Sequence, residues 1–167
     1  MSESAATSGV SSSCAVTRFL EGPIVQIAAR LALAAIFFYA AIPKIGDPAA
    51  FARDIANYRL VPEEMVSPAA VMLPWIELVT ALCLALGVLT RGAALVCAVL
   101  LAAFTAATTA AVLRGLNIEC GCFGQSGSGN AVGWGTVVRD AAFLVPAVLV
   151  VLFDRGRYGL AKAIKRP

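Results

Sequence analysis

Four long apolar blocks dominate the chain and are separated by more polar segments. They cover residues 23–42, 68–89, 92–113 and 134–153, and each is 20 or 22 residues long. A helix needs about 20 apolar residues to cross the ~30 Å hydrocarbon core of a bilayer. Because backbone groups inside that core must be satisfied within their own segment, each block is predicted to be helical. The pattern therefore predicts an all-α, integral membrane four-helix bundle.

The connections between these blocks differ in character. Within residues 43–67, Phe51, Ile55 and Tyr58 recur at helical spacing, which predicts a short amphipathic helix lying in the membrane interface. Only a two-residue turn joins the second and third blocks, so their helices are expected to be antiparallel neighbours. The last connection, residues 114–133, holds six glycines among its 20 residues and is predicted to be a polar loop.

The composition favours burial in lipid over two soluble domains. Apolar residues make up 60% of the chain and charged residues 14%, with a mean hydropathy of +0.85. Soluble domains are nearer half apolar and a quarter charged. Residues 1–22, rich in Ser and Ala, are expected to form a disordered tail, residues 23–153 the membrane domain, and residues 154–167 a basic cytoplasmic tail.

The sequence contains no histidine, which narrows its possible chemistry. This excludes Ser-His-Asp and Cys-His catalysis, histidine zinc sites and histidine-ligated haem. The net charge of +3 is small, and no basic stripe interleaved with aromatic residues points to a nucleic-acid partner. A zinc site at the cysteines of the last loop would need two further ligands, and Glu119 is the one candidate there, so no metal is expected.

The lysines and arginines predict how the chain crosses the membrane. If both termini face the cytoplasm, seven cations lie inside and four outside, as the positive-inside rule requires. The inside set is Arg18, Arg91, Arg155, Arg157, Lys162, Lys165 and Arg166, and the outside set is Lys44, Arg53, Arg59 and Arg114. The two longer connections are then expected to face outward.

Cys120 and Cys122 are the most specific chemical feature. Only Gly121 separates them, in a loop that is expected to face an oxidising compartment. Adjacent Cα atoms are about 3.8 Å apart, so these two can be at most ~7 Å apart, which reaches the ~4.4–6.8 Å range of disulfides. A ring this small would be strained, and strain favours exchangeable disulfides. A static clip on the loop and two unrelated thiols are the alternatives.

A second pair of cysteines lies within the apolar blocks. Cys83 and Cys97 are seven residues before and after Thr90, which places them at equal depth, ~10 Å inside the cytoplasmic surface, on antiparallel helices. They are a candidate second dithiol. The alternative is that both are small apolar residues that fill the core.

Charged side chains inside the blocks form a candidate polar intramembrane site. An unpaired Glu77 would cost at least ~2.5 kcal/mol, so it is expected to be paired, protonated or hydrated. Helical rise brings Arg139 within reach of Glu77, with Arg30 as the competing partner. Asp140 is not expected to share the helix face of Arg139, because consecutive helical residues point ~100° apart. Another helix, Trp75 or Tyr39 are the alternatives for what it faces. Lys44 is expected to extend to the lipid headgroups. A structural lock and a functional site are both open interpretations.

Several short motifs, in this order, resemble the DoxX-like superfamily of small four-helix membrane proteins. They are Arg30-Leu31, Phe37-Phe38, Pro43-Lys44, Pro74-Trp75-Ile76-Glu77-Leu78 and Leu86-Gly87-Val88-Leu89-Thr90-Arg91. The run Glu119-Cys120-Gly121-Cys122-Phe123-Gly124, with Arg139 in the last block, is similar to the MauE family of methylamine utilisation within that group. The resemblance covers about residues 24–155.

This resemblance implies a multi-pass protein of the bacterial inner membrane. The implied role is maturation of the disulfide-rich small subunit of periplasmic methylamine dehydrogenase, beside a thioredoxin-like partner. We therefore expect Cys120 and Cys122 to exchange with that partner, with a quinone in the bundle or the Cys83 and Cys97 pair as electron source or sink. A non-catalytic assembly factor, a DoxX-type quinone-linked oxidase subunit and a small-molecule transporter that uses Glu77 are the alternatives.

Overall fold

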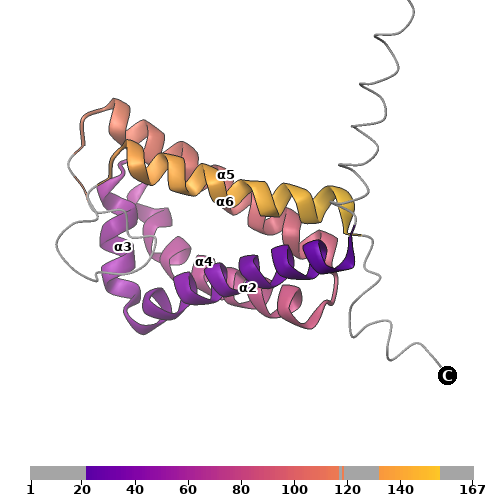
Figure 1. Ribbon diagram of the computed structural model, residues 1–167. Coiled ribbons are helices and arrows are strands. Elements are labelled where there is room, and N and C mark those ends of the chain that lie inside the picture. Colours follow the sequence, from indigo (N-terminus) through magenta and orange to yellow (C-terminus); the bar gives the residue numbers. More distant parts are fainter. Residues whose placement is uncertain (1–21, 117, 119–131, 155–167) are drawn as a thin grey trace, which may run out of the picture.

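The computed structural model describes residues 22–116, 118 and 132–154, and in these ranges it is entirely helical (Figure 1). The helices are α2 (Pro23–Gly46), α3 (Pro48–Asn57), α4 (Glu63–Leu86), α5 (Thr90–Leu113) and α6 (Trp134–Phe153). All of them except α3 are long and apolar enough to span a membrane. The all-α membrane bundle predicted from the sequence is therefore confirmed, and a short helix occupies the first connection as expected.

Three helices extend past the apolar blocks that predict them, and α5 does so by beginning at Thr90 rather than at residue 92. α2 continues through Pro43 to Gly46, although the apolar block ends at residue 42. Pro43 removes one backbone hydrogen bond of the helix, but the turn that follows it keeps its other contacts, so the helix continues to Gly46. α4 begins at Glu63 rather than at residue 68. Its first turn is acidic and so interacts favourably with the positive end of the helix dipole, but it is not apolar and therefore lies outside the predicted block.

The turn between α4 and α5 is tight and specified by a glycine. Gly87 has φ +69°, a left-handed conformation that favours glycine. The Val88 N–H donates to the Cys83 carbonyl at 2.9 Å, and the Gly87 N–H donates to the Leu84 carbonyl at 3.2 Å. This is a Schellman ending. It reverses the chain within three residues, so α4 and α5 are antiparallel neighbours, as predicted.

The four long helices pack in the cyclic order α2, α4, α5, α6, with the most extensive contacts between α2 and α4 and between α5 and α6. α3 packs across α4 at one end of the bundle (Figure 1). We call this the α3 end; there α2 and α5 end, and α4 and α6 begin. The opposite end, which contains the α4–α5 turn, we call the Leu89 end.

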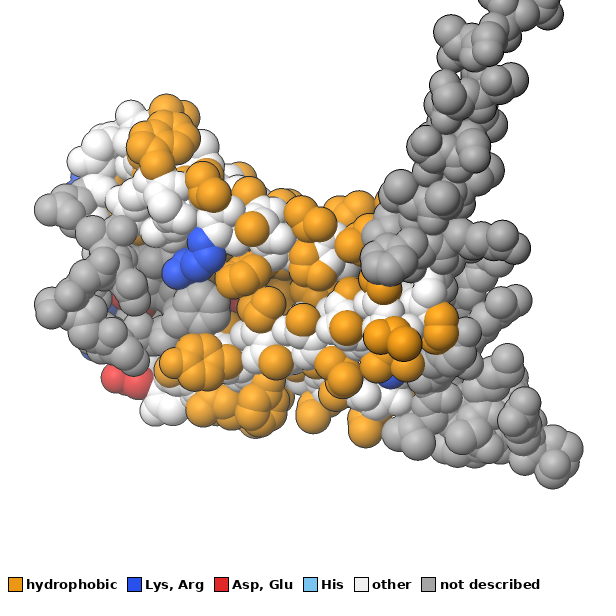
Figure 2. All heavy atoms as spheres, in the orientation of Figure 1, with side chains coloured by type: hydrophobic (Ala, Val, Ile, Leu, Met, Phe, Trp, Pro, Cys, Tyr) orange, Lys and Arg blue, Asp and Glu red, His pale blue; other side chains and the backbone are white. Residues whose placement is uncertain are grey.

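The interior combines a few large side chains with many small ones. Leu33, Phe37, Leu84, Leu101 and Val150 are buried together, with alanines and Cys97 between them. The outward surface is apolar, unlike that of a soluble protein, because large apolar side chains are exposed along every long helix. Figure 2 shows these side chains along the flank of the bundle that carries α2 and α6. In a bilayer this surface faces lipid, so it needs no protein partner.

Candidate functional site

A buried ion pair joins α2 and α4 near the α3 end. The Lys44 Nζ donates to Glu77 Oε1 at 2.7 Å and to Glu77 Oε2 at 2.9 Å. The two side chains are only 3% and 2% exposed. Removing two charges from water costs several kcal/mol each, and only close, well-oriented pairing offsets that cost. Glu77 is therefore a paired carboxylate, which is one of the three states that the sequence allowed.

The partner of Glu77 differs from the expected one, and Lys44 does not extend to the headgroups. Both expectations are wrong: Lys44 turns inward to Glu77 under Phe51 of α3, and Arg139 pairs with Asp140 instead. The Lys44 Nζ lies 4.9 Å from the ring centroids of Phe51 in α3 and Phe104 in α5. These distances suit cation–π contacts, so the ammonium is held by aromatic faces as well as by Glu77.

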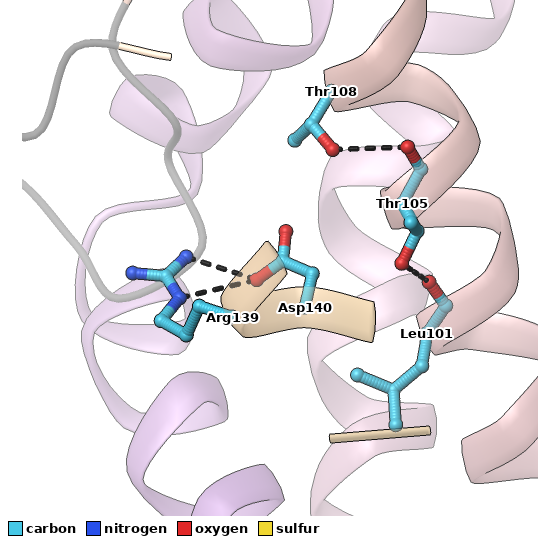
Figure 3. A network of polar contacts seen from close by, with 5 residues as sticks. All are labelled: Leu101, Thr105, Thr108, Arg139 and Asp140. Atoms are coloured by element: carbon cyan, nitrogen blue, oxygen red, sulfur yellow. Dashed lines mark hydrogen bonds and ion pairs between the residues drawn. The ribbon is translucent and has the colours of Figure 1, made fainter. Parts of the chain in front are cut away.

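A second ion pair lies within one turn of α6. Arg139 Nε and Nη2 donate to the same Asp140 oxygen, Oδ1, at 3.2 and 3.0 Å (Figure 3). The prediction that Asp140 does not share the helix face of Arg139 missed this pair, because the long arginine side chain bends back along the helix surface. The Arg139 side chain is 33% exposed and that of Asp140 5% exposed, so the arginine covers a buried carboxylate.

The second oxygen of Asp140 is a buried acceptor. Oδ2 points away from the Arg139 guanidinium in Figure 3, and no residue within the described ranges donates a hydrogen bond to it. The threonines of the neighbouring helix α5 do not supply the donor. Thr105 donates to the Leu101 carbonyl at 2.7 Å, and Thr108 to the Thr105 carbonyl at 3.0 Å. A hydroxyl has one proton to give, so both are already used.

A cavity of about 40 Å³ lies where the four long helices meet. Its polar lining consists of Lys44, Glu77 and Asp140. The remaining lining residues are apolar, namely Ile36, Phe37, Ala40, Leu101, Phe104 and Phe143. A water needs roughly 10–15 Å³ measured in this way, so the space holds only a few small groups. The chain therefore places two carboxylates and one ammonium around a small, mostly apolar chamber.

This chamber does not fit a quinone head group. A six-membered ring with two carbonyl oxygens needs far more room than a few water positions. Quinone oxygens also accept hydrogen bonds, whereas the group left open in this cavity is itself an acceptor. The residues present thus disagree with the expectation that the bundle holds a quinone at this place.

Tyr58, at the C-terminus of α3, connects the short helix to this site. Burial raises the pKa of Tyr58 to about 12, the charges of Asp140 and Asp54 act in the same direction, and Arg139 opposes them. The hydroxyl therefore stays protonated at neutral pH. The Tyr58 carbonyl accepts a hydrogen bond from Arg114 Nη1 at 3.0 Å, which ties the end of α5 to α3.

The described residues on the two sides of the last connection are hydrogen-bonded to each other. The Val132 N–H donates to the Ile118 carbonyl at 2.9 Å, between the end of α5 and the start of α6. Cys120 and Cys122 lie outside the described residues, as do the tails 1–21 and 155–167. Their predicted roles and conformations stay predictions.

The other predicted site residues lie nearer the Leu89 end. Arg30 is 6% exposed in the first half of α2. Cys97 is fully buried in the core, and Cys83 packs at its margin; both are free thiols. The described ranges hold no cluster of three or more residues that could ligate a metal ion.

Lys44 is the residue of the candidate site whose buried position sequence reasoning missed. A signal was present, because Leu33, Phe37, Ala41 and Lys44 follow one another at spacings of three and four residues. That spacing places Lys44 on the buried stripe of α2. Asp54 was also missed; it is 7% exposed and shares the inner face of α3 with Phe51.

Comparison with known proteins identifies relatives along most of the chain. The model of the family "Methylamine utilisation protein MauE" matches residues 22–153. The MauE protein of Methylophilus methylotrophus is 38% identical over 121 residues, which are 72% of this chain and 64% of that relative. The MauE protein of Paracoccus denitrificans is 35% identical over 133 residues, 79% of this chain and 71% of the relative. The chain thus spans just under two thirds of the first relative. No solved structure matches.

Proposed function

This chain belongs to the MauE family, and from that premise we propose that it is an accessory membrane protein of methylamine utilisation that exchanges disulfides through Cys120 and Cys122. Its exchange partner is a thioredoxin-like periplasmic protein. Through that partner it supports the maturation of disulfide-rich periplasmic proteins, the methylamine dehydrogenase small subunit among them. The proposal places the protein in the bacterial inner membrane, with both termini in the cytoplasm and the cysteine loop in the periplasm.

One observation carries the proposal: two cysteines separated by a glycine lie in a loop whose ends are hydrogen-bonded together at one end of a membrane bundle. Cys120 follows Ile118 by two residues, so the covalent chain tethers the pair to the α3 end. The described cysteines Cys83 and Cys97 lie in the apolar interior instead. A soluble partner would therefore meet the loop pair first.

The exchange itself needs only the two sulfurs and a partner disulfide. The thiolate of one cysteine attacks a partner sulfur, forms a mixed disulfide and releases the other partner sulfur as a thiolate. The second cysteine then attacks the first, closing the Cys120–Cys122 disulfide and releasing the reduced partner. The pair loses two electrons and two protons, and the partner gains them. The same steps run in reverse when the partner arrives reduced.

Positive charge at the α3 end supports thiolate formation in a chain without histidine. Arg114 is six residues before Cys120 in the sequence, and the side chain of Arg139 is one third exposed. Nearby cations lower the pKa of a cysteine thiol and so increase the fraction of reactive thiolate.

The proposal is tested with the full-length chain in nanodiscs equilibrated against glutathione redox buffers. We expect the Cys120–Cys122 pair to open and close reversibly, as read by alkylation and mass spectrometry. In cells, replacing both by serine should shift the redox state of disulfide-rich periplasmic proteins. The matched control replaces Cys83 and Cys97 by alanine and should leave that redox state unchanged.

Two results would contradict disulfide exchange. A pair that stays in one redox state across all glutathione ratios cannot exchange. Unchanged periplasmic redox states in the Cys120→Ser, Cys122→Ser variant would instead favour a non-catalytic assembly factor, in which the loop serves only as a docking surface.

A further inference from the structure

We propose that the cavity between the four long helices is a hydration site, whose ordered waters bridge Asp140 Oδ2 to the Lys44 ammonium. This site is separate from the cysteine loop, and it does not depend on disulfide exchange. Asp140 is 4% exposed and lines the cavity, and no residue within the described ranges forms a hydrogen bond with its Oδ2. A buried polar atom without a hydrogen bond is costly, so the partner is expected to come from the cavity itself.

Asp140 needs this partner in either protonation state. An ionised Oδ2 lacks a donor, and a protonated Oδ2 lacks an acceptor, since the other carboxylate oxygen is the one that Arg139 engages. Water can donate to the first form and accept from the second. The assignment of water therefore does not depend on whether the carboxylate carries a proton.

The charges at the cavity balance, which favours a neutral occupant over an ion. Lys44 pairs with Glu77, and Arg139 pairs with Asp140, so each cation has one carboxylate. A further ion would bring an uncompensated charge into a region of low effective dielectric, which is costly. A neutral molecule that both donates and accepts hydrogen bonds adds no charge and can still satisfy Oδ2.

The size of the cavity suits a small group of waters. Its volume of about 40 Å³ has room for about three waters, each of which needs roughly 10–15 Å³. The Lys44 ammonium donates to both oxygens of Glu77, which leaves one of its three hydrogens for another acceptor. Because Lys44 and Asp140 line the same small space, a short chain of waters can accept from the first and donate to the second.

The apolar walls confine these waters without excluding them. Cavities lined only by aliphatic and aromatic side chains stay dry, whereas buried waters occupy sites that offer polar partners. Here Lys44, Glu77 and Asp140 supply the polar partners, and the rings of Phe104 and Phe143 are part of the apolar lining. The waters are therefore expected to gather along the line from Lys44 to Asp140.

The hydrated region does not continue to the Leu89 end. Between the cavity and that end, Leu33, Leu84 and Val150 are each 0% exposed and belong to one apolar cluster. These side chains separate the cavity from the Leu89 end within the described helices. The waters thus link the ion pair of α2 and α4 to the ion pair of α6, and they do not form a path across the membrane.

X-ray radiolytic footprinting of the full-length chain in nanodiscs tests the proposal. Irradiated bound water yields hydroxyl radicals that oxidise the side chains next to it, and tandem mass spectrometry locates the oxidised residues. We expect oxidation of Phe104 and Phe143, which line the cavity. Phe38, which is 46% exposed on the lipid-facing side of α2, should stay unmodified and serves as the internal control.

Variants of the lining separate bound water from other sources of radicals. Asp140→Leu removes the polar partner and should lower the oxidation of Phe143 at least about threefold. Asp140→Asn keeps a hydrogen-bonding group and should be oxidised like the parent. Ala40→Leu fills the cavity and should lower the oxidation as Asp140→Leu does. Ala141→Leu makes the same change on the exposed face of α6, so it is the matched control and should behave as the parent.

Three results would overturn the proposal. The first is a parent chain without oxidation at Phe104 and Phe143. The second is a folded Asp140→Leu or Ala40→Leu variant that is oxidised as strongly as the parent. The third is an equal loss in Asp140→Asn, because the charge of the carboxylate, rather than its hydrogen bond to water, would then hold the occupant. The Cys120→Ser, Cys122→Ser variant should be oxidised like the parent, so this result and the fate of the disulfide proposal are independent.

Discussion

Lys44 and Glu77 depend on each other because neither reaches water. Both lie in the membrane-spanning part of the bundle, and each is at most 3% exposed. The pair neutralises two charges that would each be costly alone. It also links the last turn of α2 to the middle of α4, the two helices with the most extensive contact in the bundle.

Replacing one partner of this pair is expected to destabilise the bundle strongly. Lys44→Met leaves the Glu77 carboxylate without its counter-charge. Glu77→Leu leaves the Lys44 ammonium without its counter-charge. Each single change should lower the free energy of unfolding by ~3–5 kcal/mol, the cost of an uncompensated buried charge. Denaturant titration in micelles measures both values.

The double variant supplies the control for that experiment. Lys44→Met combined with Glu77→Leu removes both charges and keeps similar volume, so it should recover most of the lost stability. Additive losses in the double variant would show that the two side chains act separately, which contradicts the pairing.

Tyr58 predicts an alkaline loss of stability. Its ordinary pKa of 10.0 is raised to about 12 in the folded chain, chiefly by burial. Below pH 10 both states keep the proton, so the folded state is not penalised. As the pH rises from 10 to about 12, the unfolded chain ionises first, and the folded state loses stability. The unfolding midpoint measured against pH should therefore fall more steeply for the parent than for Tyr58→Phe.

Tyr39 is the matched control for this titration. It is 65% exposed on the flank of α2. Tyr39→Phe should keep the alkaline fall of the parent, whereas a fall that is equally steep in Tyr58→Phe would exclude Tyr58 as its source.

At this scale the sequence could identify the charged residues of the site but not their partners. Glu77, Arg139 and Asp140 stand out because charge is rare in apolar blocks. The distance along the helix axes made Arg139 a reasonable partner for Glu77. The sequence could not show that α3 covers Lys44 or that Arg139 bends back to Asp140, since both depend on how side chains pack in the folded chain.

α3 covers one end of the bundle and brings Phe51 against Lys44. The Asp47 side chain accepts a hydrogen bond from the Ala50 N–H at 2.9 Å and so caps the helix. The inner face of α3 carries Ala50, Phe51 and Asp54. Phe51 thus reaches Lys44 only while the helix is formed.

Loss of the cap is expected to loosen this short helix locally. Asp47→Ala should cost about 1 kcal/mol, the typical value of an N-cap. The amides of α3 should then exchange hydrogen faster, while those of α5 stay protected. Asp47→Asn keeps a capping oxygen and should exchange like the parent. Unchanged exchange in Asp47→Ala would mean that packing on α4 alone holds α3.

Helix existence was predictable at this scale, whereas helix ends were not. The apolar block that begins at Trp134 matches α6 at both ends, because Gly133 and Asp154 flank it. The C-terminus of α2 and the N-terminus of α4 were missed. The terminal turns there are polar, and the ion pair of Lys44 and the contact with α3 stabilise them. Hydrophobicity marks the span that lipid requires, and a helix can extend beyond that span.

For the whole molecule, the sequence determines the number of spans but not their cyclic order. Four helices with a short turn between the second and third allow several arrangements. The observed order depends on close contact of small residues such as Ala81, Ala94 and Ala147, which no hydropathy pattern reports. The cavity follows from that order, because all four long helices contribute to its lining.

The burial of Lys44 strengthens the expected orientation of the whole molecule. Lys44 was counted among four cations of the outward connections, but a lysine sealed in an ion pair is no loop charge. That leaves three cations in the two outward connections against seven in the segments that are expected to face the cytoplasm. The positive-inside rule then predicts a cytoplasmic Leu89 end from a larger difference in charge.

Cysteine labelling in intact cells tests this orientation. In a background with all five native cysteines replaced by serine, Val61→Cys marks the connection between α3 and α4, and Leu89→Cys marks the α4–α5 turn; both positions are exposed. A membrane-impermeant thiol reagent applied to spheroplasts should label the first site directly and the second only after permeabilisation. The reverse pattern would place the α3 end, and with it the tethered Cys120 and Cys122, in the reducing cytoplasm. Disulfide exchange with a periplasmic partner would then be impossible, whatever the chemistry of the pair.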